Sequence, residues 1–166
     1  MRRFLFVYAL VTFSLFAVIA QSDISSPRWL GWEEGVREVQ VSGKYMLVDV
    51  YTDWCGWCKK MDRAVYAHAR VQELLAARFV TVKLNAESET VITNGTNRYT
   101  EQECAKLLNV QSYPTILVFD SNFQLVVRLS GYRETDEFVR FLHYIDDKQY
   151  KRYSFDQYLE QVPSKY

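Results

Sequence analysis

The hydrophobic pattern of this chain switches between consecutive apolar runs, typical of buried strands, and apolar residues three or four positions apart, typical of amphipathic helices. The runs predict strands at 45–51, 79–84, 115–120 and 124–129. The helical spacing predicts helices at 29–41, 59–69, 71–78, 100–109, 134–144 and 154–162. This order predicts an α/β fold with a central mixed four-stranded sheet flanked by helices.

Residues 85–99 lack either period and are rich in Asn, Thr and Ser. We therefore predict a long surface loop there, and we favour flexible filler over a segment that carries partner specificity.

The N-terminus has the pattern of a targeting segment rather than of a folded element. Arg2 and Arg3 precede an almost continuous apolar run at 4–20, which closes with small residues before Gln21. This pattern is typical of a cleaved signal peptide. The alternative is an uncleaved N-terminal membrane anchor, although the run is slightly shorter than the ~20 residues that span a bilayer.

These boundaries predict the organisation of the chain. We assign a signal peptide to 1–20, an N-terminal link to 21–29, a folded domain to 30–145 and a C-terminal helical extension to 146–166.

Composition is that of a globular protein large enough for one domain. Of the 166 residues, 16% are aromatic, and 20 basic side chains balance 20 acidic ones. Such a balance gives no electrostatic basis for binding nucleic acid or an anionic membrane surface.

Candidate chemistry centres on Cys55 and Cys58, separated by two residues directly after the first predicted strand. Such a pair can hold a metal, form an inert staple or act as a reversible dithiol. Zinc needs four ligands, and only Cys104, His68 and His143 remain, without ligand spacing, so we expect no metal. A staple across three residues adds little stability, which favours the dithiol.

Cys104 lies in the predicted helix 100–109, on one face with Leu107 and Leu108. We predict a buried, small apolar residue there. The alternative is a regulatory thiol that pairs with a partner.

The motif Trp-Cys-Gly-Trp-Cys-Lys and the Tyr-Pro-Thr that opens the third strand resemble the thioredoxin-like family, over roughly residues 30–145. More narrowly, the motif is similar to that of exported bacterial thioredoxin-like proteins. Three further features agree with it: Asp49, six residues before Cys55, Pro114 before a strand, and Gly131 after a hairpin. The resemblance implies a protein thiol–disulfide oxidoreductase of the bacterial periplasm that needs no cofactor.

The resemblance also implies catalytic roles. Cys55, at the first turn of a helix, is the nucleophile, because free backbone N–H groups there favour a thiolate. Cys58 resolves the mixed disulfide, and the two cysteines form the redox-active disulfide. Asp49 is the buried acid that helps to deprotonate Cys58, and Lys83 pairs with Asp49.

The resemblance also implies which residues bind the substrate. Pro114 matches the family's cis-proline, with Tyr113 before it, and Gly131 either allows close approach of substrate or only ends the hairpin. Trp54 and Trp57 are expected to form an exposed apolar rim that grips partner proteins, unless Trp57 packs back onto the domain. Thioredoxins carry proline at position 57, so this departure leaves the direction of electron flow open.

We favour a reductase of protein disulfides. Its alternatives are a disulfide oxidase or isomerase, and a non-catalytic binding module for unfolded or haem-bearing proteins. The expected partners are disulfide-containing or thiol proteins, and a membrane electron-transfer partner is expected because an exported reductase cannot draw directly on cytosolic thioredoxin reductase. We expect a monomer that is periplasmic or secreted.

Overall fold

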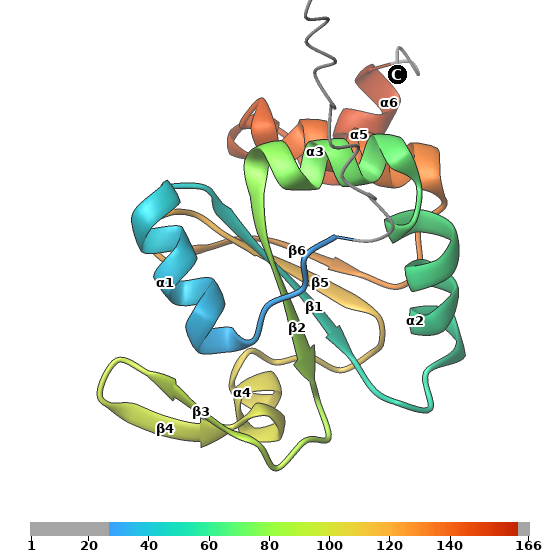
Figure 1. Cartoon of the computed structure of the whole chain (residues 1–166). Helices are drawn as coiled ribbons and strands as arrows, with labels where there is room; N and C mark the ends of the chain where they lie inside the picture. The colour runs from blue at the N-terminus through green and yellow to red at the C-terminus, as the bar shows by residue number, and fades with distance from the viewer. Residues whose placement is uncertain (1–26, 163–166) are drawn as a thin grey trace, which may run out of the picture.

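A computed structural model of the protein describes residues 27–162, in which helices cover both faces of a sheet (Figure 1). The predicted signal peptide at 1–20, residues 21–26 of the link and the last four residues of the extension lie outside the described residues. Within 27–162, no helix combines the length and the apolar character needed to cross a membrane.

The central sheet confirms the predicted fold class. Its strands are β1 (Tyr45–Tyr51), β2 (Phe79–Asn85), β5 (Thr115–Phe119) and β6 (Leu125–Ser130). They lie in the order β2-β1-β5-β6. β1 runs parallel to β2 and antiparallel to β5, and β5 runs antiparallel to β6. The register of β1 on β2 sets Asp49 opposite Lys83.

Helical segments occupy the predicted regions with shifted ends, and one further turn, η2, was not predicted. They are α1 (Trp32–Ser42), α2 (Gly56–Lys60), η1 (Met61–Tyr66), α3 (Ala69–Arg78), α4 (Glu101–Leu107), α5 (Thr135–Asp146), η2 (Gln149–Lys151) and α6 (Phe155–Gln161). α1 starts later than predicted because Leu30 forms a β-bridge to Val82. α2 starts earlier and continues into η1, a π-helix. Side chains of Thr100 and Glu103 form a capping box that starts α4.

The prediction of a loop at 85–99 is wrong, because this region contains a β-hairpin. Its strands are β3 (Val91–Asn94) and β4 (Asn97–Thr100), which pair only with each other. Gly95 has φ +63, as a tight two-residue connection requires. Of the hairpin side chains whose burial the structure describes, only Ile92 is buried, and it anchors the hairpin in the core. Its apolar neighbour Val91 is exposed, so the hairpin shows no alternation of apolar and polar residues that would predict strands.

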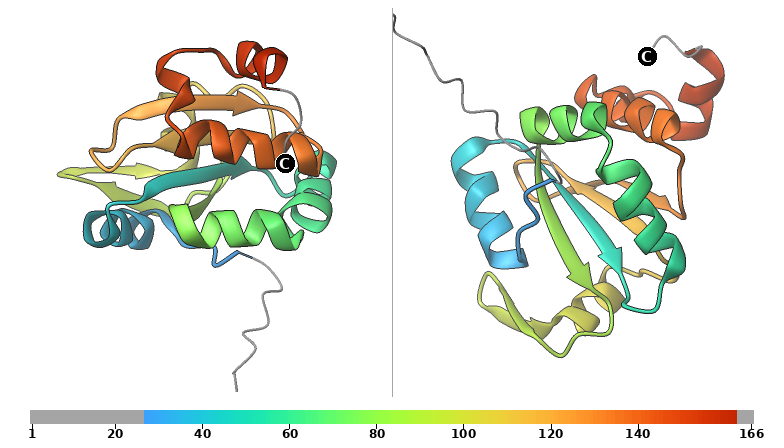
Figure 2. Two further views of the ribbon diagram at one scale, coloured as in Figure 1. Left: turned by 90° about the horizontal axis from the view of Figure 1, so that it is seen from above. Right: turned by 45° about the vertical axis from the view of Figure 1, so that its right-hand side comes forward.

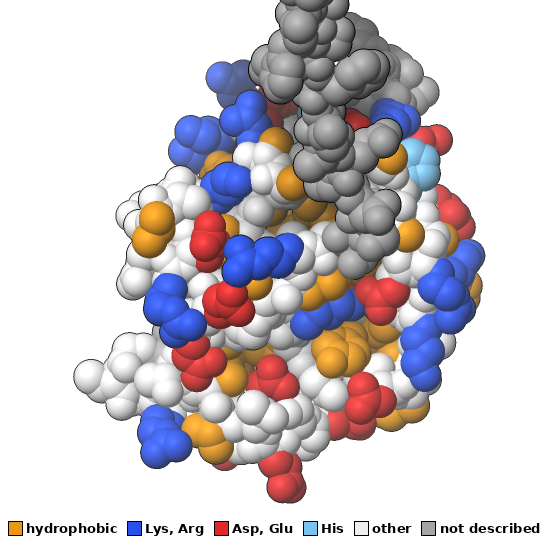
Figure 3. Space-filling model, viewed as in Figure 1, with side chains coloured by type: hydrophobic (Ala, Val, Ile, Leu, Met, Phe, Trp, Pro, Cys, Tyr) orange, Lys and Arg blue, Asp and Glu red, His pale blue; other side chains and the backbone are white. Residues whose placement is uncertain are grey.

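Two hydrophobic clusters lie on opposite faces of the sheet. η1, α3, α5 and α6 contribute to one of them, and α1 and α4 contribute to the other. Figure 1 shows α3 and α5 side by side, with α1 and α4 away from them, and Figure 2 gives the same layers from two further directions. On the face in Figure 3, acidic and basic side chains are interspersed.

Cys104 is buried on α4, as predicted, and burial raises the pKa of its thiol to about 11. The expectation that Leu107 shares its face is wrong, since the Leu107 side chain is 66% exposed. Ala105, one residue beyond Cys104, faces the core instead. The buried face of α4 is therefore narrower than we predicted from the positions of its apolar residues.

The extension packs onto α5 through aromatic rings. Phe141 is fully buried, and its ring lies 5.3 Å from Phe155 of α6 and 5.8 Å from Phe138. Edge-to-face and offset aromatic pairs of this kind add to the free energy of burial. α6 is therefore part of the folded domain's core.

We predict that Phe141→Ala lowers the free energy of unfolding by about 3–5 kcal/mol, because the cavity removes contacts on both α5 and α6. Urea denaturation followed by circular dichroism would measure it. The matched control is Leu107→Ala. Because the Leu107 side chain is exposed, this change should alter the free energy of unfolding by less than about 0.5 kcal/mol. A loss below 1 kcal/mol for Phe141→Ala would contradict this account of the core.

Candidate active site

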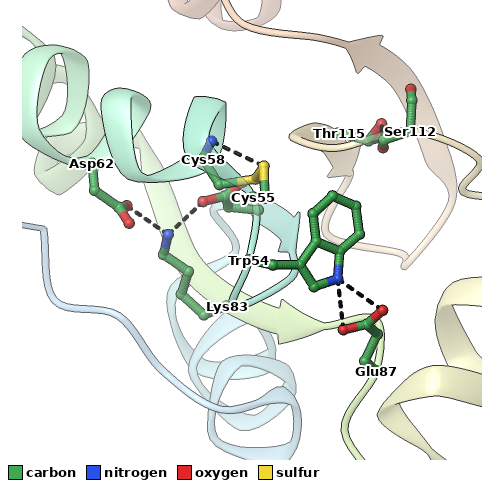
Figure 4. The surroundings of a disulfide bond; sticks show 9 residues. Trp54, Cys55, Cys58, Asp62, Lys83, Glu87, Ser112 and Thr115 are labelled. Carbon is green, nitrogen blue, oxygen red and sulfur yellow. Dashed lines mark hydrogen bonds and ion pairs between the residues drawn. A yellow bond between two sulfur atoms is a disulfide. The ribbon is translucent and has the colours of Figure 1, made fainter.

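Cys55 and Cys58 form a disulfide at the start of α2, with their Cα atoms 5.3 Å apart. Cys55 is the N-cap residue of the helix, and its Sγ accepts a hydrogen bond from the backbone N–H of Cys58 at 3.0 Å. Both cysteines are largely buried, although Gly56 and Trp57 between them are exposed. Figure 4 shows the disulfide at the end of the helix, facing the segment that carries Ser112 and Thr115. The backbone thus already presents a donor to the sulfur that would carry negative charge.

A buried ion pair lies beside the disulfide. Asp49 is fully buried in β1, and its Oδ2 accepts a hydrogen bond from Nζ of Lys83 at 2.6 Å. The same Nζ donates to Oδ1 of Asp62, also at 2.6 Å, so that one ammonium bridges two carboxylates (Figure 4). The expected pairing of Asp49 and Lys83 is therefore present. The contribution of Asp62 was missed in the sequence, where its only signal is a position four residues after Cys58.

Burial and the neighbouring charges act in opposite directions on the pKa of Asp49 and on that of Lys83. Burial raises the pKa of the Asp49 carboxyl above its usual range, although Lys83 pulls it down. Burial acts to lower the pKa of Lys83, but Asp49 and Asp62 outweigh it and the pKa is raised. Lys83 therefore stays protonated, and Asp49 is the group whose ionisation the site makes costly.

Trp54 forms one side of the site. Its indole N–H donates to both carboxylate oxygens of Glu87, each at 2.9 Å, and its ring lies edge-on to Tyr113 at 6.0 Å. The side chain is nevertheless 66% exposed. Figure 4 shows the indole nitrogen aimed at Glu87. Glu87, which follows β2, was missed because nothing local in its sequence links it to a tryptophan 33 residues away.

Trp57 is held by a different group of residues. Its ring lies 5.2 Å from that of Tyr132, and the ammonium of Lys60 sits over both rings, 5.1 Å from Trp57 and 4.4 Å from Tyr132. Glu134 completes the group by pairing with Lys60 at 3.4 Å and accepting a hydrogen bond from Tyr132. Trp57 remains 58% exposed. Both expectations for Trp57 thus hold in part, since the ring is exposed and is also held against the domain.

The segment across from the disulfide is fixed by backbone contacts. The Tyr113–Pro114 peptide is cis, as expected. The carbonyl of Pro114 accepts a hydrogen bond from the N–H of Gly131 at 2.8 Å, and Gly131 has φ +85. A side chain at position 131 would be strained in this left-handed conformation, which explains the glycine. The structure therefore brings the cis-proline segment and Gly131 together, and the role of Gly131 in substrate binding stays a prediction.

Within residues 27–162, no three or more His, Cys, Asp or Glu side chains are grouped so as to hold a metal ion. The arrangement of a dithiol pair, a buried acid and flanking aromatic rings suits proton-coupled exchange between sulfurs.

Known proteins of similar sequence share this architecture. A family model of the thioredoxin-like domain matches residues 32–146. The chain is 31% identical over 103 residues to the thiol:disulfide interchange protein DsbD of Actinobacillus pleuropneumoniae, a match that covers 61% of this chain and 16% of that protein. The chain thus corresponds to a small part of this relative's length.

Two solved structures have the same fold. A thioredoxin from Thermus thermophilus gives a TM-score of 0.62 with 27% identity, covering 74% of this chain and 89% of that one. The oxidised C-terminal domain of DsbD from Neisseria meningitidis gives 0.50 with 19% identity, covering 69% and 97%, which is a likeness of fold alone. These findings agree with the predicted class, a thiol–disulfide oxidoreductase.

Replacing Asp49 with Asn should raise the free energy of unfolding of the oxidised protein at neutral pH by about 1 kcal/mol or more. The variant no longer buries a charge, and Lys83 keeps Asp62 as a partner. The folded protein holds the Asp49 proton to a higher pH than the unfolded chain does. Wild-type stability therefore falls as pH rises from about 4 to the folded pKa, and the gain should grow over that window.

Chemical denaturation from pH 3 to pH 8 measures this dependence. Asp62→Asn is the matched control, because the Asp62 carboxylate is half-exposed and its loss should change stability by less than about 1 kcal/mol. A destabilised Asp49→Asn protein, or a gain that does not change with pH, would contradict the electrostatic account.

Proposed function

We propose that this chain, which belongs to the thioredoxin-like domain family, is an exported thiol–disulfide oxidoreductase that reduces disulfides in other proteins. The observation that carries the proposal is the Cys55–Cys58 disulfide at a helix start, beside a buried carboxylate. A disulfide that served only as a staple would need neither the buried Asp49 nor an exposed aromatic rim.

The reaction proceeds by two exchanges from the dithiol form. The Cys55 thiolate attacks one sulfur of the substrate disulfide, so that a mixed disulfide forms and the other substrate sulfur leaves as a thiolate. Cys58 then attacks the sulfur of Cys55, which forms the Cys55–Cys58 disulfide and releases the second substrate thiolate. The substrate gains two electrons and the protein loses two.

Proton transfer accompanies the second exchange. We assign Asp49 as the acceptor of the Cys58 proton, because its raised pKa suits a group that must gain a proton and release it again. Lys83 holds the ionised form by its 2.6 Å hydrogen bond. The N–H of Cys58, which bonds to the sulfur of Cys55, stabilises negative charge on the nucleophile.

Substrate binding is assigned to the surface around the disulfide. Trp54 and Trp57 each directly precede one of the two cysteines, and each is exposed by more than half. The cis-proline segment with Tyr113 and Pro114, and Gly131 bonded to it, supply backbone between them for an extended substrate chain. Disulfide-containing or thiol proteins therefore fit the site better than small molecules do.

Export and re-reduction complete the proposal. The apolar segment at 4–20 supports export to the bacterial periplasm, with an N-terminal anchor as the alternative. A reductase there must be reduced again by a dithiol partner, which we place at the membrane. The names of the interchange proteins that the chain resembles support thiol exchange. We expect the protein to act as a monomer.

A second candidate is a disulfide oxidase or isomerase. Trp57 favours it, since the residues between the cysteines influence how stable the thiolate is and thioredoxins carry proline at this position. A binding module without turnover is the third candidate, and an in vivo role that stays intact in Cys55→Ser would favour it.

The reduction potential of the Cys55–Cys58 couple separates the first two candidates. We expect a value near that of thioredoxin, about −270 mV, when the protein is equilibrated with defined thiol buffers and its thiols are counted. A value near −120 mV, as for the strong oxidant DsbA, would reverse the proposed direction. Cys104→Ser is the control, because the buried thiol should leave the potential unchanged.

Trp57→Ala should raise the KM for a protein disulfide such as insulin by about tenfold, because an exposed aromatic anchor is lost. The rate with oxidised glutathione should change far less, since a small disulfide does not span the rim. Val41→Ala, at an exposed apolar position on α1, is the control. Equal losses with both substrates would assign Trp57 to the chemistry of the cysteines rather than to partner binding.

A further inference from the structure

Two buried oxygen atoms next to the ion pair lack ordinary hydrogen-bond partners. They are Oδ1 of Asp49 and the hydroxyl of Tyr66, and both side chains are 1% exposed or less. Buried polar atoms in proteins are almost always hydrogen-bonded, and an unpaired one costs about 1–3 kcal/mol. Both side chains contact the ammonium of Lys83, and a hydrogen bond between the two atoms would satisfy both of them.

Both groups lie against the same ammonium. Nζ of Lys83 is 2.6 Å from Oδ2 of Asp49 and 5.4 Å from the centre of the Tyr66 ring. Tyr66 is the last residue of η1, four positions after Asp62, which also reaches this ammonium. The π-helical turn thus directs two side chains of one helix to the ion pair.

The ring of Tyr66 is held rigidly by its neighbours. Trp29 meets it edge-on at 4.8 Å, and Phe138 of α5 meets it edge-on at 5.6 Å. Its place is therefore set by packing from two other segments. The hydroxyl needs no further ordering to act on the carboxylate beside it.

Charge at the site fixes what this hydroxyl can do. Burial, followed by Asp49 and Asp62, raises the pKa of Tyr66 well above its usual value, so it stays a neutral donor. Burial raises the pKa of Asp49, and Tyr66 is among the groups that lower it. The other titratable groups that interact electrostatically with Asp49 are Lys83, Asp62 and Tyr51. In the reduced protein, the proposed proton donor Cys58 joins them.

We propose that Tyr66 is a positioning residue, whose hydroxyl donates a hydrogen bond to Oδ1 of Asp49 and keeps the carboxylate ready to accept the Cys58 proton. Lys83 then holds one carboxylate oxygen and Tyr66 the other. This inference rests on the proton-accepting role proposed for Asp49. Its consequence is that loss of the hydroxyl makes Asp49 harder to ionise and moves the reaction to higher pH.

The pH dependence of disulfide exchange tests the role of Tyr66. Tyr66→Phe keeps the ring and removes only the hydroxyl. We expect the midpoint of the pH–rate profile to rise by about one unit, which is about a tenfold loss of rate below the midpoint. Tyr144→Phe is the matched control, because it removes a buried hydroxyl that donates to the carbonyl of Tyr153. Its profile should equal that of the wild type.

The variants also separate this inference from the proposed function. If Asp49→Asn changes the profile but Tyr66→Phe does not, Tyr66 has no positioning role and Asp49 keeps its own. If Asp49→Asn leaves the profile unchanged, the proposed acceptor itself is wrong. An equal shift in Tyr144→Phe would show a general effect of losing a core hydroxyl and would overturn the assignment to Tyr66.

A measurement on the wild-type protein covers the case in which Tyr66→Phe does not fold. By NMR, the Tyr66 hydroxyl proton should exchange slowly with water, and its chemical shift should follow the titration of the Asp49 carboxyl carbon. A hydroxyl proton that is insensitive to the Asp49 titration would refute the hydrogen bond.

Discussion

The burial of one carboxylate, that of Asp49, is the constraint on which the arrangement of the site depends. A charge taken out of water in the middle of a sheet is tolerated only with a close partner. The parallel register of β1 and β2 supplies Lys83, and η1 supplies Asp62 to balance the ammonium on its exposed side. The strand order, the π-helical turn and the ion pair are therefore mutually dependent.

Aromatic rings surround the ammonium of Lys83, the partner of Asp49. Lys83 lies within about 5.5 Å of the ring centres of Trp29, Tyr51 and Tyr66, so its ammonium is screened from water by faces that also attract a cation. Lys60 repeats the arrangement at the surface with Trp57 and Tyr132. The high aromatic content of the chain thus serves the active site as well as the core, where rings join α5 to the C-terminal extension.

The tryptophan side chains near the disulfide are both ordered and exposed. Trp54 and Trp57 are each more than half exposed, yet each is held by a ring and a carboxylate, through Glu87 in one case and Glu134 with Lys60 in the other. Rings that are already ordered lose little conformational entropy when a partner covers them. The order of these rings is therefore consistent with the proposed binding of protein substrates.

The sequence by itself determined the sheet, most helices and the chemistry of the cysteine pair. Apolar runs report burial on both faces of a strand, and the motif with Asp49, Pro114 and Gly131 carried the resemblance to the thioredoxin-like family. Only the tertiary structure revealed the β3–β4 hairpin, whose one buried anchor produces no period. It alone also revealed the partners Asp62, Glu87 and Glu134. These polar contacts join residues up to 74 positions apart, and their geometry depends on how elements cross rather than on any local pattern.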